Sequence, residues 1–232
     1  MIDVEKLLTN ATVITLRKRP ERGASFLSRW QTLTGRAPRI VYGFDGERVP
    51  IPTGWQTSPG AFGCCLAHVS AQYRVLSDAE YGDDDPLAFF EDDAVFCDGF
   101  LTKLDALAPL VPDDCDVLYL GGEHLLGGRR APERVADGLV RAYNVNRLHA
   151  YVVRARALPK IATRLLAYAT NAPERRGPSG DETCCDYEVG RMTEEGELTV
   201  YAASPFLVGQ GGFGSDTYPG KAPDENQVRF WN

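Results

Sequence analysis

Short runs of apolar and β-branched residues alternate along this chain with longer stretches whose apolar residues recur every three or four positions. The short runs predict strands at 11–16, 39–44, 87–90, 116–120, 148–153 and 198–201. The longer stretches predict helices at 21–33, 58–76, 98–107 and 161–168. This alternation is typical of one α/β domain with a mostly parallel central sheet flanked by helices.

Capping and turn residues suggest where these elements begin and end. We expect Ser58 and Pro59 to start one helix and Asp98 to cap another. Gly121-Gly122 is expected to close the fourth strand, and residues 171–180, rich in proline, glycine and arginine, are expected to form a loop. The chain has no internal repeat or evident linker, so we predict a single domain over 1–232, with a glycine-rich tail at 209–232.

Three consecutive carboxylates, Glu91-Asp92-Asp93, directly follow the apolar run 87–90. If the strand continues, Glu91 and Asp93 point to the same side, because strand side chains alternate. Paired acids at the end of a buried strand suit a hard divalent cation such as Mg²⁺ or Mn²⁺. The alternative is a solvated acidic turn. Ligands of α/β sheets bind beyond the carboxyl ends of strands, which favours the cation site.

Composition narrows the function classes. The formal net charge of −7 argues against a broad nucleic-acid-binding face. No run approaches the roughly 20 apolar residues that span a bilayer. The N-terminus lacks the features of a signal peptide, so we expect a cytoplasmic protein that is soluble or peripherally associated with a membrane. The six cysteines lack a disulfide or zinc spacing, and we expect reduced, mostly buried thiols.

Several segments, taken in order, resemble the glycosyltransferases of family 25, which include lipooligosaccharide and collagen galactosyltransferases. The resemblance extends over residues 11–216. The segments that carry it are Val13–Leu16 with Arg19–Arg22, Phe44–Gly46, Gly63-Cys64 with Leu66–His68, Phe90–Ala94, Leu118–Gly121, His149–Val153, Pro205–Leu207, Gln210 and Ser215-Asp216.

The resemblance implies a GT-A fold, which is Rossmann-like, with Mn²⁺ or Mg²⁺ and a nucleotide-sugar donor, expected to be UDP-linked. Glu91, Asp93 and Asp186 are the implied metal ligands. Members of the family invert the anomeric centre, which requires a carboxylate to accept the proton of the acceptor hydroxyl. Asp186 is our first candidate for this base and Asp181 the second, while Asp92 is expected to face the ribose or the sugar.

The donor nucleotide is expected to contact residues near the strand ends and in the glycine-rich segment. The candidates are Thr15, Arg17, Arg22, Asp45, His68, Gln210 and Ser215. Arginines after the first strand suit phosphate, but they would also suit a solvated basic turn. A histidine on an apolar helix face is more commonly a hydrogen-bonded core residue, and for His68 both interpretations stay open.

The chain departs from the family pattern at Ala67, Tyr73 and Leu148, where serine, tryptophan and threonine are common. The loops 121–144 and 171–181 are the least family-like. The acceptor is therefore open: a saccharide or glycolipid, as in lipopolysaccharide biosynthesis, a protein, or a modified base in DNA. Two other function classes also use paired acids, namely a non-catalytic metal- or carbohydrate-binding domain with structural Ca²⁺ and a sugar nucleotidyltransferase.

Overall fold

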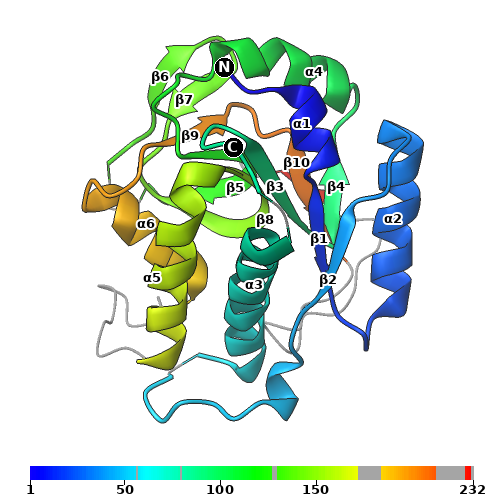
Figure 1. Ribbon diagram of the computed structural model, residues 1–232. Helices are drawn as coiled ribbons and strands as arrows, with labels where there is room; N and C mark the ends of the chain where they lie inside the picture. The colour runs from blue at the N-terminus through cyan, green and yellow to red at the C-terminus, as the bar shows by residue number, and fades with distance from the viewer. Residues whose placement is uncertain (56, 79, 127–129, 172–183, 213–227, 231–232) are drawn as a thin grey trace.

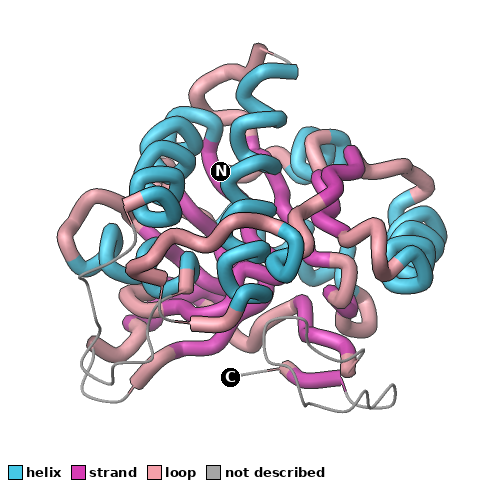
Figure 2. The backbone as a smooth tube through the Cα atoms, turned by 90° about the horizontal axis from the view of Figure 1, so that it is seen from below, coloured by secondary structure: helices cyan, strands magenta, loops and turns pink. Residues whose placement is uncertain are grey.

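A mixed β-sheet lies between two layers of helices in the computed structural model of the chain (Figures 1 and 2). The structure describes residues 1–55, 57–78, 80–126, 130–171, 184–212 and 228–230. The helices are α1 Val4–Thr9, α2 Pro20–Thr34, α3 Pro59–Asp78, α4 Phe100–Leu107, α5 Leu158–Thr170 and α6 Cys185–Glu194, with short 3₁₀ turns η1 Gly46–Arg48, η2 Ala108–Leu110 and η3 Ala155–Ala157. The strands are β1 Thr12–Thr15, β2 Arg39–Tyr42, β3 Pro86–Glu91, β4 Ala94–Phe96, β5 Val117–His124, β6 Glu133–Ala136, β7 Leu139–Arg141, β8 Val145–Arg154, β9 Val200–Ala203, β10 Val208–Gly211 and β11 Val228–Arg229.

The eight-stranded sheet has the order β2-β1-β3-β8-β5-β9-β7-β6. The pairs β2–β1, β1–β3 and β5–β9 are parallel, and the other four described pairs of this sheet are antiparallel. The prediction of an α/β fold with parallel core strands flanked by helices is confirmed. Two of the antiparallel pairs arise because the long strand β8 inserts between β3 and β5, and the hairpin β6–β7 beside β9 adds the other two.

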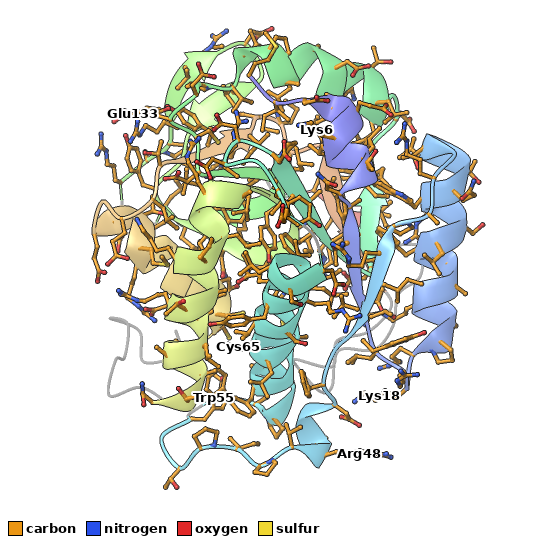
Figure 3. All side chains as sticks on the ribbon, in the orientation of Figure 1. Lys6, Lys18, Arg48, Trp55, Cys65 and Glu133 are labelled. Atoms are coloured by element: carbon orange, nitrogen blue, oxygen red, sulfur yellow. The ribbon has the colours of Figure 1, made fainter. Side chains whose placement is uncertain are left out.

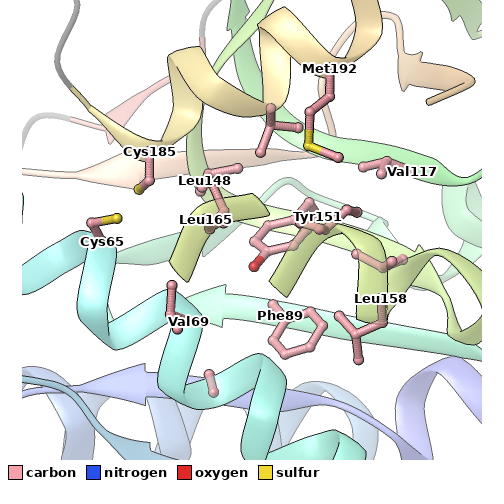
Figure 4. Close-up of a cluster of buried hydrophobic side chains, with 14 of the residues drawn as sticks. Cys65, Val69, Phe89, Val117, Leu148, Tyr151, Leu158, Leu165, Cys185 and Met192 are labelled. Atoms are coloured by element: carbon pink, nitrogen blue, oxygen red, sulfur yellow. The ribbon is translucent and has the colours of Figure 1, made fainter. Parts of the chain in front are cut away.

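Side chains alternate across the sheet and so supply two cores. Phe89, Tyr119 and Tyr151 pack with α3, α5 and α6 on one face (Figure 4). Phe90 and Leu118 pack with α1, α2 and α4 on the other face. Because consecutive residues of β3 serve opposite cores, the apolar run Leu87–Phe90 must be continuous, as in strands buried on both faces.

Some predicted boundaries are wrong. Strand β5 does not stop at Gly121-Gly122 but runs on to His124. A Cβ on Gly121 would lie 2.3 Å from the carbonyl oxygen of Val208. The glycine thus lets β10 approach β5 closely instead of ending the strand. The N-cap of α4 is Gly99, in the left-handed conformation, and not Asp98. Helices α1 and α6 and the hairpin β6–β7 were not predicted, since their apolar patterns are short.

The parallel strands β1, β2 and β3 bring their carboxyl ends to one edge of the sheet. Thr15 pairs with Tyr42, and Ile14 pairs with Glu91. A second, three-stranded sheet has the order β11-β10-β4, and only two residues separate its strand β4 from the end of β3. The expected loop 171–180 lies, but for Asn171, outside the described residues. None of the described helices combines the length and apolar character needed to cross a bilayer.

Candidate functional site

The acidic run turns the chain from the large sheet into the small one. Strand β3 ends at Glu91, Asp92 and Asp93 form a tight turn, and β4 starts at Ala94. The strand does not continue through the acids, so the condition under which alternation would place Glu91 and Asp93 on one side is not met. Asp92 and Asp93 are nevertheless only 4% and 6% exposed. The acids are therefore not a solvated turn, and their charges need partners.

Arg22 of α2 supplies one such partner. Its guanidinium lies 2.5 Å from a carboxylate oxygen of Asp92 and 3.1 Å from one of Asp93. The Thr15 hydroxyl, at the end of β1, donates to Asp92 over 2.8 Å. Thr15 and Arg22, both predicted to contact the nucleotide, thus hold the acidic turn in this structure. They connect the end of β1 and the first turn of α2 to the acidic turn that follows β3.

The carboxylates of Glu91 and Asp92 lie close enough to Asp93 to act on its charge, together with the Arg22 guanidinium. Burial raises the pKa of Asp93, and the neighbouring charge of Glu91 raises it further, to about 7. Burial also raises the pKa of Asp92. The Oδ1 atom of Asp93 is buried and has no hydrogen-bond partner among the described residues. An unsatisfied, buried carboxylate oxygen of this kind needs an explanation, and a cation is one.

A hydrogen-bond chain leads from Asp93 to Asp186. Gln210 of β10 donates to Asp93 over 3.1 Å and accepts from Arg147 over 3.4 Å. The Arg147 Nε donates to Glu123 of β5 over 2.9 Å. The Arg147 backbone N–H donates to Asp186 over 3.0 Å. Four elements, β5, β8, β10 and α6, therefore contribute to one polar cluster with the acidic turn.

Arg147 and Glu123 were missed from the sequence. Arg147 lies within β8 but has a φ of 73°, a backbone conformation that non-glycine residues rarely adopt. An arginine directly before the predicted strand that starts at Leu148 was the one available sign. Glu123 was missed because Gly121-Gly122 was expected to end the strand before it.

Asp186 lies in the first turn of α6. Its carboxylate accepts from the backbone N–H groups of Arg147 and Tyr187, each over 3.0 Å. Burial raises its pKa despite these hydrogen bonds. The structure thus brings Asp186, a predicted site residue, into the same polar cluster as Asp93, although 93 residues separate them in sequence. Asp181 and Ser215 lie outside the described residues.

Glu91 faces a different set of neighbours. Its Oε1 lies 3.1 Å from Nε2 of His68 and 3.6 Å from Sγ of Cys64, both on α3. Burial would lower the pKa of His68, but hydrogen bonds with Cys64 and Glu91 outweigh it and raise the pKa to about 10. The other ring nitrogen of His68 lies 3.1 Å from the Tyr151 hydroxyl. His68 is fully buried, with both ring nitrogens engaged, as the core interpretation expects.

The remaining nucleotide candidates lie at the ends of β1 and β2. Arg17 stacks on the ring of Tyr42, with its guanidinium carbon 3.9 Å from the ring centroid. Asp45 caps η1 and accepts from Lys18 over 2.8 Å, and that hydrogen bond holds its pKa below the usual range. Lys18 and Arg48, which flank Asp45, mark this end of the molecule in Figure 3.

Comparisons with known proteins add a fold likeness and nothing finer. No family model matches the chain, and no curated protein matches it. Among solved structures, the chain is similar to the crystal structure of a glycosyltransferase involved in the glycosylation of the major capsid of PBCV-1. The TM-score is 0.38 and the sequence identity 11%, over 84% of this chain and 93% of that chain. Membership of family 25 stays a prediction.

The geometry defines what this edge of the sheet can do chemically. The acidic turn offers hard oxygen ligands, and Arg17 and Lys18 place positive charge at the neighbouring strand end. Asp186 offers a partly buried carboxylate whose raised pKa suits it to accept a proton. Hard ligands and cationic side chains therefore lie at the ends of the parallel strands, and Arg147 and Gln210 connect Asp186 to the acidic turn.

Proposed function

We propose that this protein is a metal-dependent glycosyltransferase that moves a hexose from a UDP-linked sugar to an acceptor hydroxyl with inversion. The observation that carries the proposal is the buried acidic turn, with its unpartnered Asp93 oxygen at the carboxyl ends of β1 and β3. The motif order that resembles family 25 supports it independently. A saccharide or glycolipid is the acceptor we favour, because the net charge of −7 disfavours DNA.

The residues at the acidic turn fit a hard divalent cation, Mn²⁺ or Mg²⁺. We assign Asp93 as the principal ligand, because its Oδ1 is unsatisfied and because a cation would offset the neighbouring charges of Glu91 and Asp92, which raise the pKa of its carboxyl. Bound there, the ion would neutralise charge that grows on the departing diphosphate. Glu91, the other ligand expected from the sequence, has one oxygen engaged by His68 and Cys64.

Asp186 is our candidate for the general base. Two backbone N–H groups fix its carboxylate, and burial raises its pKa toward the range useful for proton transfer. Arg147 connects it through Gln210 to Asp93, so base and metal ligand would be positioned by one hydrogen-bond chain. Asp181 stays the second candidate.

The donor nucleotide would lie over the ends of β1 and β2. Arg17 and Lys18 would contact the diphosphate, because they follow β1 and directly precede the start of helix α2, where backbone N–H groups favour anions. Asp45 would accept from a ribose or uracil group. Thr15 and Arg22 would act indirectly, by holding Asp92 and Asp93 in place.

The decisive test is thermal stability with a panel of nucleoside diphosphates, each with and without Mn²⁺. A ligand that binds only the folded state at about 100 times its Kd stabilises it by about 2.7 kcal/mol, or about 5–10 °C for a chain of this length. We expect one diphosphate to give such a shift with Mn²⁺ only. Asp93→Asn should abolish it, and Asp105→Asn, an exposed acid on α4, should retain it.

Other outcomes distinguish the competing classes. Stabilisation by Ca²⁺ with no response to any nucleotide would contradict the proposal and favour a binding domain. Exchange of pyrophosphate into a nucleoside triphosphate would indicate a nucleotidyltransferase. Slow, Mn²⁺-dependent hydrolysis of one UDP-sugar by the wild type, lost in Asp93→Asn, would support the transferase and identify its donor.

A further inference from the structure

A second group of converging side chains lies beside the acidic turn. Cys64 and His68 are one helical turn apart on α3 and therefore share a face. Glu91, at the end of β3, faces them. Cys64 Sγ, His68 Nε2 and a Glu91 carboxylate oxygen all lie within 4.8 Å of one another. A thiol, an imidazole and a carboxylate thus point at one volume between a helix and a strand end.

The separations are close to those of ligands around a tetrahedral ion, so small side-chain shifts would complete the geometry. Ligands bound to Zn²⁺ at about 2.0–2.3 Å lie about 3.3–3.8 Å from one another. Glu91 Oε1 is 3.1 Å from Nε2 of His68 and 3.6 Å from Sγ of Cys64. We propose that Cys64, His68 and Glu91 form a zinc-binding site, separate from the Asp93 site, that ties α3 to the end of β3.

The ligand types set this site apart from the acidic turn. Thiolate and imidazole favour Zn²⁺ or Co²⁺, whereas the carboxylate oxygens of the acidic turn suit Mn²⁺ or Mg²⁺. The Tyr151 hydroxyl, 3.1 Å from Nδ1 of His68, fixes the ring so that Nε2 faces the ion. Such an outer partner commonly accompanies a metal-bound histidine. Each ion would therefore select its own site.

Burial and access also suit a metal. His68 is fully buried, while Cys64 and Glu91 are partly exposed, so an ion could reach the site from that side. Interaction with the Cys185 thiol, at the start of α6, raises the pKa of Cys64, and Figure 4 shows Cys185 pointing toward α3. The six cysteines are free thiols in the structure. A bound ion would thus stabilise the meeting point of α3, β3 and α6 without taking part in sugar transfer.

Cobalt titration of the metal-free protein tests the site directly, because Co²⁺ bound to a thiolate absorbs in the near ultraviolet and Co²⁺ bound to oxygen alone does not. We expect this absorption to saturate at one equivalent of Co²⁺ and to disappear when Zn²⁺ is added. Cys64→Ser and His68→Gln should lose it. Cys97→Ser and Asp93→Asn should retain it, so the result is independent of the proposed transferase activity.

A measurement on the wild type guards against variants that fail to fold. Zn²⁺ at one equivalent should slow the alkylation of Cys64, followed by mass spectrometry, at least tenfold while leaving Cys97 unchanged. Tyr151→Phe should weaken Zn²⁺ binding about tenfold, as loss of an outer partner does. Absence of the cobalt absorption in the wild type, or unchanged alkylation of Cys64, would overturn the proposal and leave a hydrogen-bonded Cys-His-Glu cluster without metal.

Discussion

Asp93 is surrounded by groups that act on its charge in opposite directions. Burial and the charge of Glu91 disfavour the carboxylate, whereas Arg22 and the hydrogen bond from Gln210 favour it. The balance raises its pKa to about 7, so without a metal ion the carboxyl is partly protonated near neutral pH. A divalent cation would reverse this balance, because it binds only the ionised form.

This shift predicts a pH-dependent stability difference between wild type and Asp93→Asn. From about pH 4 to 7, folded Asp93 holds a proton that the unfolded chain releases, so its contribution to stability is present below pH 4 and lost as pH rises through 7. The asparagine of Asp93→Asn does not titrate, so the variant does not lose this stability as pH rises. In the absence of divalent cations, the variant should therefore gain stability relative to wild type by up to about 1.4 kcal/mol per pH unit.

Urea unfolding at steps between pH 4.5 and 7 measures this difference. The comparison must be variant against wild type, because buried His149, whose pKa burial lowers to about 4, contributes a slope of opposite sign in both proteins. Asp105→Asn should give a flat difference. A flat difference for Asp93→Asn as well would mean that Asp93 is ionised throughout and that its pKa is not raised.

At the scale of elements, β5 and β10 approach each other so closely at Gly121 that no larger side chain fits there. A Cβ on Gly121 would lie 2.3 Å from the Val208 carbonyl oxygen and 2.4 Å from Nε2 of His149. Both atoms belong to buried, packed parts of the chain, so neither can move aside at low cost. The close approach places Gln210, two residues after Val208, within reach of Asp93 and Arg147.

Gly121→Ala should therefore destabilise the fold by about 3 kcal/mol, at the upper end of ordinary overpacking. It should also weaken Mn²⁺-dependent nucleotide binding, because β10 would be pushed away from the acidic turn. Chemical denaturation measures the first effect and the thermal-shift panel the second. Gly82→Ala is the control, since its nearest contact would be 3.7 Å. Equal stability of the two variants would show that β10 can shift freely.

At the scale of the whole molecule, the candidate site is confined to one edge of the sheet. The carboxyl ends of β1, β2 and β3 meet there, and the small sheet and α6 bring in Gln210 and Asp186. Helices α1 and α4 pack on the face of the sheet that carries the second core, around Phe90 and Leu118. Binding at the site should thus order one end of the molecule.

Amide hydrogen exchange, measured with and without the cognate diphosphate and Mn²⁺, should show which segments the bound ligand protects. We expect protection in segments 16–22, 43–48 and 91–95, with little change in α1 and α4. Asp93→Asn should lose the protection at 91–95 first. Protection centred on the hairpin β6–β7 instead would place the nucleotide at the opposite end of the sheet and contradict the assignment.

The sequence by itself determined the features that depend on local spacing. The strand and helix order, the α/β class, the position of the acids at a strand end and the helix start at Pro59 follow from periodicity and turn residues. Asp93, Asp186 and Gln210 were predicted as site residues, and the structure brings them into one cluster. Their roles as metal ligand, base and donor contact stay predictions.

Only the tertiary structure decided which groups neutralise the acids. Gln210 is 117 residues from Asp93 in sequence, and Arg147 is 24 residues from Glu123. The φ of 73° at Arg147 and the separation of Glu91 from Asp93 by a tight turn have no local sequence signal. Local patterns report which faces are buried, whereas the partners of a buried charge depend on how distant strands pair and cross.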